Sequence, residues 1–369
     1  MSASSSFGAS GRPRSPGAPG SPGAPTRVYF TVDVECSEER LVGGAWRPAL
    51  GYDLRVWGRL ANQRRELGID LIMRELEAVG GRGTFFLEAL GAHHFGRAGL
   101  AEACQAMVAR GHDVQLHTHP VQRHAAFHSA GEAPASDNIG AYDVDRQAAL
   151  LREGVDLLAE AGAPRDRLLA FRAGNFGANN DTWRAMADAG LRVSSNYNPC
   201  YFTLHCKMRS PRAQAGLFAT ETPGVYELPV STFVESGGGF RHLQITAVSL
   251  REMLDALRQY RALGVGEVTV VTHSFEFFFL DSHTAKTGRP NQVNIERMRG
   301  LLRFIADNPR DFALETVAEL AARLPQGTAL PDRELALPQG KPWLRAGRFA
   351  EQGYKRFVER AGARLPLPL

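Results

Sequence analysis

Two acidic residues end an apolar run near the start of this sequence. In the segment 29–35, Asp33 and Glu35 alternate with Val32 and Val34. On an extended strand, side chains two positions apart point the same way, so the two carboxylates would share one face. In an apolar frame they repel each other unless a cation or a shared proton lies between them. We therefore expect a metal site first and a shared-proton pair second. The plain alternative is a strand end with both acids in water.

Two histidines follow another apolar run. His117 and His119 flank Thr118 directly after the segment 113–116, and if the extended geometry persists both imidazoles project to one side, close enough to bind one cation. Taken alone, they would suit loop or core histidines that form ordinary hydrogen bonds. The carboxylates at another strand end favour the metal. Two imidazoles and one carboxylate leave a position for water, which is typical of a catalytic zinc site.

Two cationic side chains complete the set. Arg172 ends the run 168–171, and Gly174 beyond it permits close backbone approach. The guanidinium could hold a carboxylate bidentately and keep it ionised; the alternative is an ordinary ion pair that closes the fold. His273 follows the β-branched run 270–272 and could protonate a leaving group, or be a structural histidine.

All six residues stand at the ends of predicted strands, within a chain in which strands and helices alternate. The predicted strands span 28–34, 83–87, 113–117, 168–171, 193–195, 226–229 and 268–272, and the helices 69–77, 100–110, 143–161, 181–189, 250–263 and 295–307. About seven such units predict a right-handed parallel (β/α) barrel, complete or incomplete. In such barrels, the active site lies at the carboxyl ends of the strands.

Five segments, in this order, resemble the polysaccharide deacetylase superfamily, the NodB-homology domain of carbohydrate esterase family 4, over residues 27–320. They are 30–35, 83–86, 111–120, 171–175 and 271–274. The resemblance implies a distorted (β/α) barrel of the glycoside hydrolase/deacetylase type. It also implies a divalent metal held by one carboxylate and two histidines. The implied activity is removal of an N- or O-acetyl group, or hydrolysis of another C–N bond as in the imidase-like and allantoinase-like branches.

By position, Asp33 resembles the catalytic base of this family and Glu35 its metal carboxylate. His117 resembles the first metal histidine. Arg172 resembles the arginine that orients the base, and His273 resembles the acid that protonates the leaving amine.

The second metal histidine departs from the family pattern. The family places it four positions after His117, where this chain has Val121. His119 is the natural substitute, as in branches with a His-x-His-Pro sequence, and His124 is the other choice. The resemblance therefore implies Glu35, His117 and His119 as metal ligands.

Composition limits the classes of protein. A chain of 369 residues with 44% hydrophobic content can bury one large core. The net charge of +4 is spread without a basic face, which argues against nucleic acid as a partner. No apolar run is long enough to span a membrane, and the four cysteines, at no zinc-type spacing, read as free thiols.

The expected organisation has three parts. Residues 1–26 form a disordered leader rich in Pro, Gly and Ser and without the apolar core of a signal peptide, 27–324 form the barrel, and 325–369 form a peripheral Pro/Arg-rich tail with one amphipathic helix at 346–359. A cytoplasmic location is the default.

These residues together predict a metal-dependent hydrolase of amide rather than peptide bonds. The expected reaction removes an acetyl group from an acetylated sugar or glycan precursor, with zinc as the expected metal and cobalt, nickel or manganese as alternatives. Two other functions stay open. One is hydrolysis of a cyclic imide or ureide; the other is a binding or assembly role in polysaccharide metabolism for a barrel that has lost its chemistry. The sequence leaves open whether the protein forms a homo-oligomer.

Overall fold

One curved, mostly parallel sheet organises the molecule. The computed structural model describes residues 24–123, 136–283, 285–324, 330 and 336–361. The strand order is β12-β1-β4-β5-β6-β7-β9-β8, and β15 pairs with β1 beside this path. The strands are β1 (Thr26–Val34), β4 (Thr84–Glu88), β5 (Asp113–Thr118), β6 (Ala170–Ala173), β7 (Val193–Ser194), β8 (Phe218–Ala219), β9 (Tyr226–Glu227), β12 (Glu267–His273) and β15 (Phe312–Leu314). Within this sheet, as far as the chain is described, β8 and β9 form the one antiparallel pair. The order ends at β12 and β8, so the sheet is an open half-barrel, which confirms the predicted α/β fold in its incomplete form.

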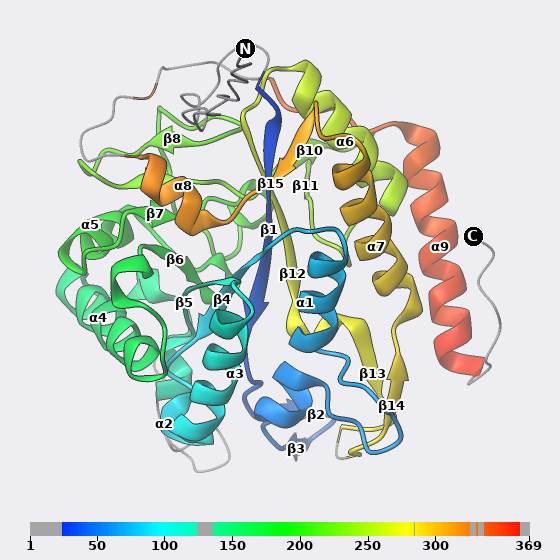
Figure 1. Ribbon diagram of the computed structural model, residues 1–369, viewed down its shortest axis with the longest axis horizontal. Helices are drawn as coiled ribbons and strands as arrows, with labels where there is room; N and C mark the ends of the chain where they lie inside the picture. Colours follow the sequence, from blue (N-terminus) through cyan, green and yellow to red (C-terminus); the bar gives the residue numbers. More distant parts are fainter. Residues whose placement is uncertain (1–23, 124–135, 284, 325–329, 331–335, 362–369) are drawn as a thin grey trace, which may run out of the picture.

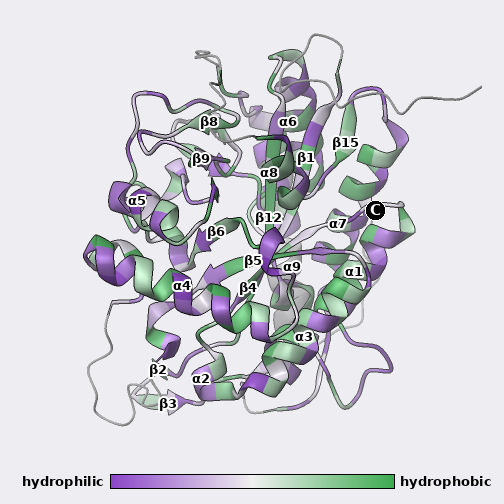
Figure 2. Ribbon diagram, turned by 60° about the vertical axis from the view of Figure 1, so that its left-hand side comes forward, coloured by the Kyte–Doolittle hydropathy of each residue, from purple (hydrophilic) through white to green (hydrophobic). Residues whose placement is uncertain are grey.

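Amphipathic helices cover the convex side of the sheet (Figure 1). They are α1 (Ile69–Ala78), α3 (Arg97–Ala109), α4 (Val144–Glu160), α5 (Asn180–Asp188), α6 (Leu250–Ala262) and α7 (Gln292–Asp307). Neighbouring helices contact one another, as α3 with α4 and α6 with α7. Figure 2 shows hydrophobic residues along the central strands β1 and β12, while the surrounding helices carry both hydrophobic and hydrophilic residues.

Alternation along β1 separates two apolar clusters. Val28, Phe30 and Val32 belong to the large core beneath the helices, whereas Tyr29 belongs to a second cluster on the concave side. That second cluster includes Val317 and Leu320 of the short helix α8 (Val317–Arg323). Because side chains alternate along a strand, Asp33 shares the concave side with Tyr29. The concave side is therefore packed by α8 near the start of β1 and carries polar groups near its end.

Three hairpins lie outside the main sheet, and the sequence analysis did not predict them. They are β2 (Arg40–Val42) with β3 (Ala45–Arg47), β10 (Thr232–Val234) with β11 (Phe240–His242), and β13 (Phe278–Leu280) with β14 (Gly288–Pro290). The first follows β1 and the third follows β12, so both lie at the carboxyl end of the sheet (Figure 1).

Two elements, β1 and the helix of the tail, begin earlier in the chain than predicted. β1 begins at Thr26, a buried residue inside the predicted leader, because Thr26 pairs with Phe312 of β15. Residues 1–23 lie outside the described part of the chain. The amphipathic helix of the tail is longer than predicted: α9 (Pro342–Ala361) runs along the outer side of α6.

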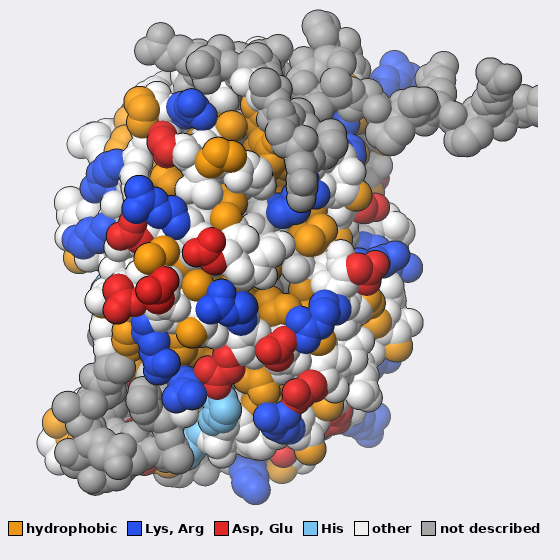
Figure 3. Space-filling view, turned by 90° about the vertical axis from the view of Figure 1, so that its left-hand side faces the viewer, with side chains coloured by type: hydrophobic (Ala, Val, Ile, Leu, Met, Phe, Trp, Pro, Cys, Tyr) orange, Lys and Arg blue, Asp and Glu red, His pale blue; other side chains and the backbone are white. Residues whose placement is uncertain are grey.

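The cysteines and the surface charges are as the amino-acid composition predicts. All four cysteines are free thiols, as predicted. On the face shown in Figure 3, cationic and anionic side chains are interspersed. Among the described residues, no helix has the length and apolar content to cross a bilayer.

Candidate active site

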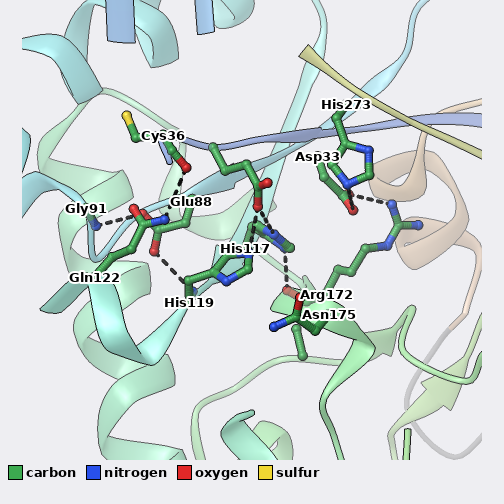
Figure 4. A network of polar contacts seen from close by, with 12 residues as sticks. Asp33, Cys36, Glu88, Gly91, His117, His119, Gln122, Arg172, Asn175 and His273 are labelled. Carbon is green, nitrogen blue, oxygen red and sulfur yellow. Dashed lines mark hydrogen bonds and ion pairs between the residues drawn. The ribbon is translucent and has the colours of Figure 1, made fainter. Parts of the chain in front are cut away.

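The strand register brings the predicted site residues together at the carboxyl end of the sheet. Asp33 of β1 is the register partner of His273 of β12, and His117 of β5 is the partner of Arg172 of β6. The side chains meet on the concave side and form two adjoining clusters (Figure 4). The first is centred on Asp33 and the second on Glu35.

Arg172 anchors the first cluster from a fully buried position. Its Nη1 donates to Asp33 Oδ1 at 2.7 Å and to Thr31 Oγ1 at 3.0 Å. Its other edge donates to the Ser195 carbonyl and hydroxyl at 3.2 and 2.9 Å. The predicted bidentate grip on the carboxylate is therefore wrong, because Ser195 occupies the second edge of the guanidinium. The single charge-assisted bond still orients the Asp33 carboxylate.

His273 completes the first cluster from β12. Its Nε2 lies 3.9 Å from Asp33 Oδ2, and its Nδ1 donates to Glu276 Oε1 at 2.8 Å. Burial disfavours the imidazolium, but the carboxylates of Glu276, Asp33 and Glu35 together outweigh burial and raise the pKa of His273 to about 9. Thr272 and Gln244 also donate to Glu276, at 2.6 Å each, and help to hold its pKa below the usual value. At neutral pH, His273 therefore carries a proton on the nitrogen that faces Asp33.

The second cluster joins Glu35 to the two histidines. Glu35 Oε2 lies 2.6 Å from His119 Nε2 and 3.4 Å from His117 Nε2, and one ligand atom of each residue lies within 4.8 Å of the others. Arg55 approaches the other carboxylate oxygen at 3.7 Å. The structure thus brings together the three predicted metal ligands. The alternative ligand, His124, lies outside the described residues.

Outer partners fix the orientation of both imidazoles. His117 Nδ1 donates to the Arg172 carbonyl at 2.8 Å, and His119 Nδ1 donates to Asp137 Oδ2 at 2.8 Å. Because these oxygens can only accept, the protons lie on Nδ1 and each Nε2 is directed at Glu35. Carboxylate or carbonyl acceptors on the far nitrogen are typical of metal-binding histidines. Two such nitrogens and a carboxylate oxygen fit a divalent cation.

The charges in the second cluster support the same conclusion. Burial alone would raise the pKa of Glu35, but His119 and His117 outweigh it and hold that pKa well below its usual range. Conversely, Asp137 and Glu35 raise the pKa of His119 well above its usual value, against the effect of burial. Glu35 is therefore an anion, and a cation at this point would take the place of the proton between Glu35 and His119.

Backbone geometry leaves room for the His119 ring. An added Cβ at Gly174 would lie 2.4–2.6 Å from three atoms of this imidazole, which confirms the predicted close approach. The next two residues, Asn175 and Phe176, have φ of 57° and 54°, and Asn175 Nδ2 donates to Asp137 Oδ2 at 2.7 Å. Left-handed conformations of non-glycine residues are strained and cluster at functional sites.

Glu88 ties the loop after β5 to the end of β4. Its buried carboxylate accepts the backbone N–H groups of Leu90, Gly91 and His119 at 2.9, 2.7 and 3.2 Å. Burial raises the pKa of Glu88 to about 7, against the opposing effects of His119 and the backbone donors. Glu88 therefore positions the backbone that carries His119.

Three carboxylates of the site were not predicted from the sequence. Glu88 ends an apolar strand, so the same strand-end pattern that revealed Asp33 would have found it. Glu276 lies three residues after His273, the spacing of one short helical turn, within a run of phenylalanines. Asp137 lies in a connecting segment and carried no signal.

Comparisons with known proteins support the fold. No family profile matches the sequence, and no curated protein matches it. A provisionally assigned polysaccharide deacetylase from Mycobacterium smegmatis superposes with a TM-score of 0.51 at 18% identity, covering 86% of this chain and 99% of that one. A provisionally assigned glycoside hydrolase/deacetylase from Parabacteroides distasonis aligns with a TM-score of 0.48 at 10% identity, covering 82% and 72%. The first match confirms the predicted polysaccharide deacetylase fold.

Proposed function

We propose that this protein is a metal-dependent amide hydrolase that removes an acetyl group from an acetylated sugar or glycan precursor. The observation that carries the proposal is that two side-chain clusters lie next to each other at the carboxyl end of the sheet. Asp33 with Arg172 and His273 offers a base and an acid 3.9 Å apart, and the Glu35 cluster beside them fits a divalent cation. The fold shared with a provisionally assigned polysaccharide deacetylase supports a sugar as the substrate.

The side chains of the first cluster suit hydrolysis of an amide. Asp33 takes a proton from the water that attacks the acyl carbon, and Arg172 orients this carboxylate before the reaction. His273 Nε2 gives its proton to the nitrogen as the C–N bond breaks, so that acetate and a free amine leave. Glu276 stabilises the imidazolium that supplies this proton.

The second cluster supplies the remaining chemistry. A divalent cation held by Glu35, His117 and His119 would act as a Lewis acid that polarises the acetyl carbonyl and acidifies water. Asp137 and the Arg172 carbonyl keep the two imidazoles aligned for that role.

The test compares Asp33→Asn with the wild-type protein for acetate release from N-acetylated oligosaccharides, together with metal content by elemental analysis. We expect turnover to be lost while metal content stays unchanged, since Asp33 belongs to the first cluster only. Asp156→Asn, at an exposed position of α4, is the matched control and should retain turnover. Turnover retained in Asp33→Asn would contradict the assigned role.

A second arm separates the alternative functions. Cyclic imides and ureides are assayed beside the acetylated sugars with the same preparation. Hydrolysis of the cyclic substrates alone would replace the sugar in this proposal. A protein that neither retains nor rebinds metal and acts on no substrate would favour the binding role.

A further inference from the structure

A group of aromatic side chains lies beside the two clusters and takes no part in the proposed chemistry. Its centre is Tyr201, the last residue of the short helical turn η7 (Pro199–Tyr201), which follows β7. The side chain of Asn198 caps this turn. The loop that carries Tyr201 starts at Ser195, the residue that occupies one edge of Arg172. Tyr201 therefore belongs to the carboxyl end of the sheet, as the two clusters do.

Three rings fix the position of the Tyr201 phenol. The ring of His242 stacks on it, with the centroids 5.6 Å apart and the planes at 25°. The rings of Phe176 and His205 lie at 5.5 and 6.3 Å and are tilted by 38° and 34°. Phe176 also lies beside Arg172, whose guanidinium carbon is 5.9 Å from the ring centroid. A phenol packed among three rings is held in one orientation before any ligand arrives.

From His242, a chain of contacts leads to the first cluster. Gln244 forms a side-chain hydrogen bond with His242 and donates to Glu276 Oε1 at 2.6 Å. Glu276 in turn accepts from His273, the proposed acid, at 2.8 Å. Burial raises the pKa of Tyr201 most, and the Glu276 carboxylate adds to this effect. The phenol thus lies near the polar groups that hold the acid.

From His205, a second chain of contacts leads to the metal cluster. Asn138 Nδ2 donates to His205 Nδ1 at 3.4 Å. The neighbouring Asp137 accepts from the outer nitrogen of His119, one of the proposed metal ligands, at 2.8 Å. Contacts from both clusters therefore meet at the ring of Tyr201.

The Tyr201 hydroxyl is available to a ligand. Among the described residues, none forms a hydrogen bond with this hydroxyl, and it is not sealed in the interior. By contrast, His242 Nδ1 accepts from Asn198 at 3.2 Å, and His205 Nδ1 accepts from Asn138. A phenol can both donate and accept a hydrogen bond. Such a polar tip on a fixed apolar body suits a sugar, which carries hydroxyl groups around an apolar ring.

We propose that Tyr201 is a specificity-determining residue for the sugar. Its hydroxyl forms a hydrogen bond with a hydroxyl group of the sugar ring that carries the acetyl group, while Phe176 and His242 keep the phenol in place. This bond orients the acetyl group toward Asp33 and His273. The inference rests on the proposed function for its substrate, but the contact between Tyr201 and the sugar can be tested without turnover.

Removing the hydroxyl alone gives the sharpest test. Tyr201→Phe keeps the ring and its packing, so thermal unfolding should match that of the wild type. With an N-acetylated chitooligosaccharide, we expect KM to rise roughly 3- to 10-fold and kcat to fall by much less, since the lost bond is made equally in the ground state and the transition state. With 4-nitrophenyl acetate, which carries no sugar hydroxyl, the loss should be smaller. Leu204→Ala, at an exposed position of the same loop, is the control and should behave as the wild type does.

Binding to the metal-free protein separates this inference from the proposed function. Ligand-observed NMR titration with the same oligosaccharide is carried out on the full chain in the presence of a chelator. The Kd of Tyr201→Phe should exceed that of the wild type by roughly 3- to 10-fold. This result supports the contact with Tyr201 even if no acetate is released, in which case the hydrolase alone would be refuted.

Three results would overturn the inference. Unchanged KM and Kd in Tyr201→Phe would show that the hydroxyl does not contact the sugar. An equal loss with the oligosaccharide and with 4-nitrophenyl acetate would assign the phenol to the chemistry or to the fold. A wild type that binds no acetylated sugar would remove the ligand itself.

Discussion

The two carboxylates at the end of β1 meet different kinds of cation. Asp33 faces the guanidinium of Arg172, which is fully buried and permanently charged. Glu35 faces His117 and His119, whose ring nitrogens can carry a proton or release it to a metal. Two residues of sequence therefore separate a carboxylate with a fixed partner from one with an exchangeable partner. The first arrangement suits a base that is held in one orientation, and the second suits a metal site.

Removing the fixed cation should have the largest effect. Arg172→Met removes the hydrogen-bonded cation from buried Asp33 and leaves only the more distant His273 beside it, so we expect the free energy of unfolding to fall by about 3–5 kcal/mol and turnover to disappear. Urea unfolding measures the change. The double variant Arg172→Met/Asp33→Asn should recover part of the loss, since no unpaired charge remains. Equal destabilisation of the single and double variants would show that the ion pair is unimportant.

Removing the carboxylate with the exchangeable partner should abolish stabilisation by metal. With a chelator, Glu35→Gln should be less stable than the wild type by the lost ion pair with His119, and this loss does not depend on zinc. With zinc at a hundredfold excess over its Kd, the wild type should gain about 2.7 kcal/mol and the variant nothing. Thermal unfolding with and without zinc checks this difference. The same zinc-dependent gain in both proteins would remove Glu35 from the ligand set.

Adding a methyl group beside His119 should weaken metal binding. Gly174→Ala places a Cβ within 2.6 Å of the imidazole, so the ring must shift. We expect metal affinity to fall roughly 10- to 100-fold, the range found when the outer support of a ligand is disturbed. Isothermal titration calorimetry measures the affinity. Gly347→Ala, where an added Cβ meets no atom within 4 Å, is the control. Unchanged affinity in Gly174→Ala would mean that His119 is not a ligand.

The smallest expected effect concerns the pH dependence of the first cluster. Glu276, with smaller contributions from Asp33 and Glu35, raises the pKa of His273 to about 9 against the effect of burial, so turnover should fall as pH rises through about 9, when the proton donor is lost. In Glu276→Gln this alkaline limb should move toward about 6.5, the ordinary histidine value. The pH–rate profiles of the two proteins give the comparison. An unmoved limb would assign the ionisation to another group.

The same pKa has a consequence for stability, and its sign can be worked out. The folded pKa of His273 lies above the ordinary value, so the fold favours the imidazolium. Its stabilising contribution is complete below about pH 6.5 and is lost as pH rises through about 9. The difference in unfolding free energy between wild type and His273→Gln should shrink over this interval.

Much of the site could be predicted from sequence because its polar residues lie near the ends of apolar strands. Asp33, His117, Arg172 and His273 are each the last or second-to-last residue of a β-strand, and parallel strands bring their carboxyl ends to one edge. Asp137 could not be found in this way, because its contact with His119 depends on the path of a loop. Equally, no local pattern shows that Ser195 occupies one edge of Arg172 and prevents a bidentate grip.

Some missed features of the fold did carry a signal. The hairpin β2–β3 turns at Gly43 and Gly44, both with positive φ, and a Gly-Gly pair between apolar residues is a known hairpin pattern. By contrast, the pairing of Thr26–Val28 with β15 joins segments nearly 290 positions apart and leaves no trace in local sequence. Such distant partners are decided by packing rather than by propensity.

The position of β1 among its neighbours bears on how such proteins can diverge. β1 is held in register by β12, β4 and β15 together. The register fixes Asp33 opposite His273 and Phe86, and Glu35 follows Val34, the last residue of the strand. An insertion in β1 would disrupt these pairings and displace the base from its acid. The loops around the site carry no such constraint, so we expect changes in substrate preference to arise there rather than in this strand.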